Sequence, residues 1–149
     1  MDRDDAVEAL HNVRQTDCAL ERRTRWPLWR HAAFGALEAL LLLAWGVPLA
    51  AMAACLLIAV AGLWWIVADD RRRYGMFVSG YSSRAALPAT ALAFAIVLGG
   101  FAVLIMTGGP NRWTPYVLPV VGAVFVGCTL ASIWWEKLYR AELRQDGIR

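Results

Sequence analysis

Four apolar runs, set apart by short turns or polar segments, dominate the pattern of hydrophobic and polar positions along this chain. The clearest run covers residues 50–68, in which 19 consecutive positions carry no charged side chain. A helix that crosses a bilayer needs about 20 such residues, because each residue adds only about 1.5 Å of length. The four runs therefore predict an all-α integral membrane protein, with transmembrane helices over residues 28–46, 48–68, 85–106 and 115–135.

The connections between these runs predict how the helices pair. Residues 46–48 leave almost no room outside the first two helices, so the second helix must return directly beside the first. Residues 107–114 contain Gly, Pro and Asn, which is the composition of a tight turn between the third and fourth helices. Two antiparallel hairpins follow, joined by the longer polar segment 69–84.

Small residues spaced four apart mark one face of each predicted span. Such faces let helix backbones approach closely in lipid, where the hydrophobic effect does not drive helices together. We expect the four slim faces to pack into one bundle and to permit a homo-oligomer. The positions are Gly35 and Ala39; Ala51, Cys55 and Ala59; Ala91, Ala95 and Gly99; and Ala123, Gly127 and Ala131.

The segments outside the predicted spans are polar. Residues 4–25 predict an amphipathic cytoplasmic helix, because apolar residues such as Leu10, Val13 and Leu20 recur at helical spacing. This helix has three competing uses: lying on the membrane surface, packing on the central loop, or pairing with a second copy. A solvated helix with one packed edge is the alternative to all three. The predicted organisation is a cytoplasmic helix over 1–26, a four-helix transmembrane domain over 27–135 and a cytoplasmic tail over 136–149.

Composition and charge favour burial in lipid. The chain has 149 residues and is 59% hydrophobic, whereas soluble domains are about 45–50% apolar. Of its 15 Lys and Arg residues, 14 fall on one side of four spans, and Arg112 falls on the other. Because short basic loops stay inside, both termini and the central segment are predicted to be cytoplasmic, in a bacterial inner membrane. Acids dilute the net charge of +3 beside each basic cluster, which disfavours nucleic-acid binding.

Glu38 is the one charged residue expected near the middle of a span. A carboxylate at that depth costs about 2.5 kcal/mol or more, so we expect it to be protonated, paired or facing water. One interpretation is a proton-linked or cation-binding site, with His31 two turns earlier linking Glu38 to the cytoplasm through water. The other interpretation is structural: a neutral carboxyl bonds to a hydroxyl group of a neighbouring helix, from Thr90, Thr129 or Ser132.

The central segment is too apolar for a simple linker and combines basic with aromatic residues. Its arginines favour anionic lipid headgroups by about 1 kcal/mol per residue near the membrane surface. Topological anchoring alone explains the arginines, whereas a lipid-sensing or partner-docking loop also uses the aromatic residues. The residues concerned are Arg71, Arg72, Arg73, Tyr74, Phe77 and Tyr81. The expected partners are therefore anionic lipids and an unidentified membrane protein.

Catalytic and metal-binding patterns are absent from the sequence. The chain has two histidines and no HExxH, no GxSxG and no paired intramembrane acids. Its three cysteines show no CxxC spacing, so they predict buried thiols rather than a disulfide framework or a zinc site. We therefore expect no enzymatic activity, no cofactor and no metal.

In layout the chain resembles a group of small, uncharacterised bacterial inner-membrane proteins. Members carry a charged amino-terminal helix, two helical hairpins and a cytoplasmic loop like residues 71–81, which read RRRYGMFVSGY here. The resemblance covers most of the chain and implies location and architecture.

Two functions are compatible with these features of the sequence. The first is a non-enzymatic accessory or regulatory membrane module that acts through the basic loop and the amino-terminal helix. The alternative is a small proton-coupled transporter with Glu38 as its intramembrane carboxylate. A polar crevice that reaches Glu38 favours the transporter, and a dry, tightly packed bundle favours the accessory module.

Overall fold

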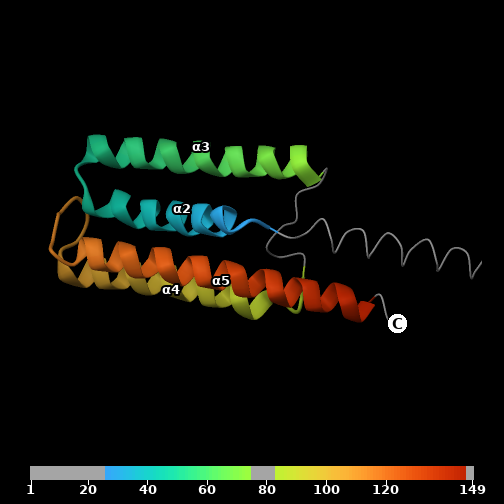
Figure 1. Ribbon diagram of the computed structural model, residues 1–149. Coiled ribbons are helices and arrows are strands. Elements are labelled where there is room, and N and C mark those ends of the chain that lie inside the picture. Colours follow the sequence, from blue (N-terminus) through green and yellow to red (C-terminus); the bar gives the residue numbers. More distant parts are fainter. Residues whose placement is uncertain (1–25, 75–82, 147–149) are drawn as a thin grey trace, which may run out of the picture.

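The computed structural model describes residues 26–74 and 83–146, and every regular element within these two ranges is an α-helix (Figure 1). The helices are α2 (Leu28–Gly46), α3 (Leu49–Tyr74), α4 (Leu87–Thr107) and α5 (Val117–Asp146). The all-α fold is confirmed for this part of the chain. The predicted amino-terminal helix over 4–25 lies outside the described residues, so it stays a prediction.

Prolines mark the starts of three helices. Pro27 directly precedes α2, and Pro88 lies in the first turn of α4, where a missing backbone N–H costs nothing. Pro48 separates α2 from α3, and its carbonyl oxygen accepts a hydrogen bond from the Met52 amide at 2.9 Å. These positions explain why each helix begins where its apolar run begins.

Two helices extend beyond the spans predicted for them. α3 continues through residues 69–74, which we expected in the central loop, and α5 continues without a break from residue 135 to Asp146. The extension of α3 has a physical cause. Asp70 is buried against α2, where its carboxylate pairs with Arg30, so the contact holds this turn in the helix.

The central helix of the bundle is α2. It packs against α5, against α3 and, over a smaller contact, against α4, while α4 and α5 pack against each other. α3 packs chiefly against α2, and Figure 1 shows it as an outer helix, with α4 and α5 on the other side of α2. The hairpin pairs predicted from the short connections, α2 with α3 and α4 with α5, are therefore neighbours in space.

Three of the four helices are long and apolar enough to cross a membrane. These segments are Leu49–Arg72 in α3, Leu87–Thr107 in α4 and Val117–Glu142 in α5. Their length and composition indicate a membrane-embedded protein. α2 has 19 residues and is not among the three, because it carries Arg30, His31 and Glu38.

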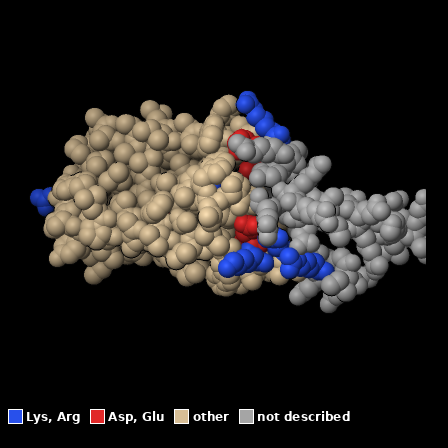
Figure 2. All heavy atoms as spheres, viewed as in Figure 1, with Lys and Arg blue, Asp and Glu red and all other residues tan. Residues whose placement is uncertain are grey.

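The described charged side chains gather at one end of the bundle. Figure 2 shows the acidic groups and most basic groups at the end where α5 finishes, with uncharged surface along the helices. Of the charged residues in the two described ranges, Arg112 lies at the opposite end, in the turn between α4 and α5. Glu38 lies between the two ends. This distribution agrees with the one-sided charge seen in the sequence.

The backbones of α2 and α5 come very close at Gly35. A Cβ atom added to Gly35 would lie 2.6 Å from the carbonyl oxygen of Phe125 and would also overlap the hydroxyl oxygen of Thr129. Ala39, one turn further along α2, is buried as well. The slim face predicted for the first span is therefore confirmed.

The slim face predicted for α4 is wrong. Ala91, Ala95 and Gly99 are exposed, and the glycine inside the interface is Gly100, where an added Cβ would lie 2.5 Å from Cδ2 of Leu42. Alanine is abundant in these helices, so small residues four apart also occur on lipid-facing sides. Among the positions predicted on α3 and α5, Cys55, Ala59, Gly127 and Ala131 are at least partly buried, and Ala51 and Ala123 are exposed.

We expect Gly35→Ala to lower the free energy of unfolding by about 1–3 kcal/mol, because the new methyl group overlaps the backbone of α5. Gly99→Ala is the matched control, since no atom lies within 4 Å of a Cβ at that position. The control is expected to be neutral or stabilising by up to about 1 kcal/mol. Thermal unfolding of the detergent-solubilised variants measures both effects. Equal stability of the two variants would contradict the close approach of α2 and α5.

Candidate functional site

An ion pair joins α2 to α3 at the charged end of the bundle. The Arg30 guanidinium donates to both carboxylate oxygens of Asp70, from Nε at 2.9 Å and from Nη2 at 2.5 Å. The side chains are only 11% and 5% exposed, so this two-point contact is largely removed from solvent. The guanidinium also lies 3.6 Å from the ring centre of Trp26, which adds a cation–π contact. The charge of Arg30 is thus compensated within the protein.

A second set of polar contacts joins α2 to α5. The ring nitrogens of His31 lie 2.8 Å from Ser132 Oγ and 2.8 Å from Glu136 Oε2, and His31 is only 1% exposed. Arg140 lies 3.7 Å from the other Glu136 oxygen. Both polar atoms of the imidazole are therefore occupied by α5, which explains how a histidine is accommodated in this interface.

Aromatic stacking reinforces the same contact. Trp135 of α5 stacks on Trp26 at 5.2 Å between ring centres and on Tyr139 at 5.1 Å. Trp135 is 6% exposed, so its ring is packed inside the interface between helices. We call the ion pair, the histidine contacts and this stack the polar clamp. It comprises Trp26, Arg30, His31, Asp70, Ser132, Trp135, Glu136 and Tyr139.

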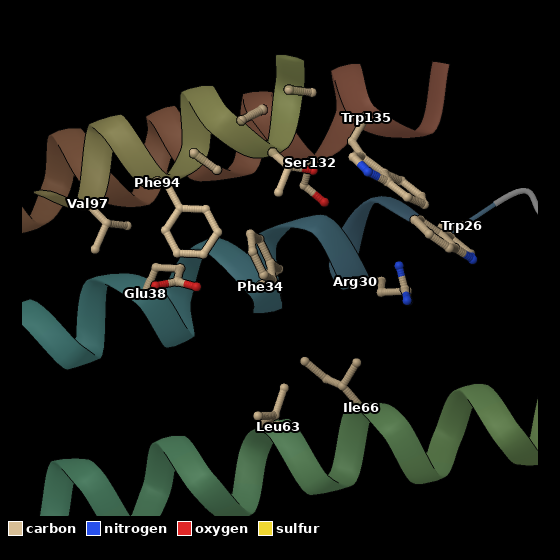
Figure 3. Close-up of a pocket in the computed structure, with 14 residues that line it drawn as sticks. Trp26, Arg30, Phe34, Glu38, Leu63, Ile66, Phe94, Val97, Ser132 and Trp135 are labelled. Atoms are coloured by element: carbon tan, nitrogen blue, oxygen red, sulfur yellow. The ribbon is translucent and has the colours of Figure 1, made fainter. Parts of the chain in front are cut away.

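A groove runs from the polar clamp into the apolar part of the bundle. Its cavity volume is about 320 Å³, which is in the range of small-ligand sites. Figure 3 shows Arg30, Phe34 and Glu38 in a row along α2, at spacings of four residues, with side chains of α3 and α4 facing them. The lining residues are Trp26, Arg30, Phe34, Glu38, Leu63, Ile66, Ala89, Thr90, Ala93, Phe94, Val97, Ala131, Ser132 and Trp135.

The Glu38 carboxyl group faces this groove and is half-buried. It forms no hydrogen bond or ion pair with any residue in the described ranges. The three hydroxyl groups proposed as its partners are engaged elsewhere: Thr129 donates to the Phe125 carbonyl, Thr90 to the Ala86 carbonyl, and Ser132 bonds to His31. The structural role predicted for Glu38 therefore has no support in these contacts.

The predicted site residues do not come together in one place. Glu38 lines the groove, whereas the ring of His31 is held by α5 and does not line it. Arg71 and Arg72 are exposed at the end of α3. Arg73 and Tyr74 fall in the last turn of the same helix, and Phe77 and Tyr81 lie outside the described residues.

Several residues that shape the groove and its mouth are not among the predicted site residues. Arg30 and Asp70 carry a usable signal, because opposite charges at the same end of two antiparallel neighbours are placed to pair. Phe34 and Phe94 carry no such signal, since they are two apolar residues among many. Among the described residues, no group of three or more His, Cys, Asp or Glu side chains is placed to hold a metal ion.

We expect Asp70→Asn to destabilise the protein by about 3–5 kcal/mol, because it leaves the buried Arg30 guanidinium charged and without its partner. Arg71→Gln removes a charge from the neighbouring exposed position and is expected to change stability by less than about 0.5 kcal/mol. Thermal unfolding in detergent compares the two. If Asp70→Asn unfolded at the same temperature as Arg71→Gln, the ion pair would have no structural role.

The described residues thus form an apolar groove, a carboxyl group inside it that none of them pairs with, and a paired, stacked clamp at its mouth. Comparison with family models, with curated proteins and with solved structures finds no match to this chain. The chemistry of the site is therefore argued from its own residues.

Proposed function

We propose that the chain is a four-span integral membrane protein that exchanges a proton on Glu38 for a small ligand bound in the groove. The observation that supports this proposal is a cavity of about 320 Å³ lined by a carboxyl group that has no partner among the described residues. An unpaired carboxylate costs several kcal/mol in an apolar environment. A carboxyl group that binds either a proton or a ligand avoids this cost, because its charge is then neutralised in both states.

The fourth span in this proposal is α2. Its polar residues exclude it from the clearly apolar helices, but Arg30 and His31 are buried and paired with α3 and α5, so they do not face lipid. Polar side chains are accommodated in membrane helices when they face the interior of the bundle. Four spans place both termini on one side, and the basic residues there favour the cytoplasmic side of a bacterial inner membrane.

The groove meets one of the two features expected of a transporter, because it reaches Glu38, but its lining is not polar. Its lining is mostly apolar, so the ligand is expected to be apolar over most of its surface. The accessory role depends on residues 4–25 and on the basic loop. Of these, residues 4–25, Phe77 and Tyr81 lie outside the described ranges, whereas Arg71, Arg72, Arg73 and Tyr74 end α3. That role stays a prediction.

The topology is tested with compartment reporters fused to the amino terminus, to the carboxyl terminus after Arg149, and after Asn111. If α2 crosses the membrane, the two terminal reporters are active on the same, cytoplasmic side and the Asn111 reporter on the other. If α2 does not cross, the two terminal reporters are active on opposite sides. The latter outcome would rule out four spans.

The proton on Glu38 is tested with a hydrophobic carbodiimide, which adds to neutral carboxyl groups that face an apolar environment. We expect labelling of Glu38 that increases as pH falls, because the ionised carboxylate does not react. Intact-mass spectrometry should show no such adduct in Glu38→Gln. The control Glu142→Gln removes a carboxylate at the charged end, where it contacts Ser83, and should label like the wild type. Labelling that persists in Glu38→Gln would refute the proposal.

A further inference from the structure

The groove carries one uncompensated ionisable group. Arg30 and Glu38 are the lining residues with basic or acidic side chains. The charge of Arg30 is neutralised by its two-point contact with Asp70. Ionised Glu38 therefore leaves the groove with one net negative charge. A positive charge on a ligand would compensate this negative charge. An anionic ligand would be repelled by it, and strongly so in a site of low dielectric constant.

No other side chain at the groove competes for this carboxylate. The elements that face Glu38 across the groove supply Leu63 and Ile66 from α3, and Thr90 and Phe94 from α4. On α5, the nearest titratable group is the buried thiol of Cys128. Arg30 lies eight residues away along α2, about 12 Å at the rise of a helix. A basic group must therefore come from the ligand.

Two aromatic rings flank the carboxyl group. Phe34 lies one turn from Glu38 on α2, and Figure 3 shows Phe94 extending from α4 to the level of Glu38. These residues are 37% and 53% exposed, so part of each is accessible to a bound molecule. Aromatic faces attract organic cations, and they also pack against apolar groups. The site thus combines the negative charge of ionised Glu38 with neighbouring aromatic rings, and both features suit an organic cation.

The groove is reached from the side of the bundle. The groove lies between α3 and α4, with α2 at its base. Because α3 packs chiefly against α2, no packed contact between α3 and α4 closes the groove. The surrounding surfaces of α3 and α4 are apolar and lie on segments long enough to span a membrane. A ligand that partitions into the bilayer can therefore reach Glu38 without crossing the polar clamp.

From these observations we infer that the groove binds a hydrophobic monovalent organic cation, with its positive centre beside Glu38 and its apolar body against Phe34 and Phe94. The inference rests on the proposed function and names its ligand class. On binding, the neutral Glu38 carboxyl group loses its proton and the cation takes its place. One proton is released for each cation bound.

Two probes of nearly equal size and opposite charge test this assignment: tetraphenylphosphonium and tetraphenylborate. Equilibrium dialysis with the purified, detergent-solubilised chain should show saturable binding of the phosphonium cation and no saturable binding of the borate anion. A pH indicator in weakly buffered solution should record about one proton released per cation bound, as a single carboxyl group requires. Glu38→Gln should weaken cation binding at least tenfold and abolish the proton release.

The aromatic contribution is tested with a matched pair of variants. Phe94→Ala should weaken cation binding about two- to fivefold, as expected for a cation–π contact of about 0.5–1 kcal/mol. Phe125→Ala removes a comparably exposed phenylalanine from α5 outside the groove and should leave binding unchanged. If both variants lost the same amount of binding affinity, a specific contact between the cation and Phe94 would be refuted.

Carbodiimide labelling separates failure of this inference from failure of the proposed function. Tetraphenylphosphonium should protect Glu38 from the reagent, and tetraphenylborate should not. If Glu38 is labelled in the wild type but the cation neither binds nor protects, or the anion does so equally well, the cation assignment is overturned and the proton-bearing site stands. If Glu38 is not labelled at any pH, both the cation assignment and the proposed proton-bearing site are refuted.

Discussion

The requirement that polar groups be satisfied inside the protein, and not by lipid, governs this structure. α2 carries Arg30, His31 and Glu38, and it is the described helix that contacts all three of the others. Arg30 pairs with α3, and His31 bonds to Ser132 and Glu136 of α5, so each polar group on α2 near the charged end has a specific partner on another helix. The central place of α2 agrees with this requirement, because its buried polar side chains contact neighbouring helices, and the long apolar segments of α3, α4 and α5 lie around it.

Glu38 departs from that rule among the described residues. Its neighbours along α2 show that the protein can satisfy buried polar groups, since His31 uses both ring nitrogens. Hydroxyl groups also lie on the facing helices, yet Thr129 and Ser132 bond elsewhere. A carboxyl group beside an apolar groove, with no partner among the described residues, is the basis on which we propose a proton and a ligand at Glu38.

The positions of the helices were predictable from sequence because they depend on local properties: apolar runs of membrane-spanning length, prolines at their starts and turn residues between them. Helix packing was less predictable. The face containing Gly35 was correct, but the abundance of alanine hid the fact that α4 packs through Gly100 and not Gly99. Of the site, Glu38 was found because a charge within an apolar run is conspicuous. Phe94 was not, because its role depends on which face of α4 meets the groove.

The tight and loose contacts of the bundle have complementary effects. α2 and α5 approach so closely at Gly35 that even a methyl group would overlap the backbone, which fixes the height and rotation of α2 and hence the position of Glu38. α3 is attached chiefly to α2, and its Asp70 contact lies at the mouth of the groove. A rigid α2–α5 pair therefore positions the carboxyl group, while the separation of α3 from α4 leaves space beside it. If α3 packed equally tightly against α4, Glu38 would be enclosed and would need a protein partner of its own.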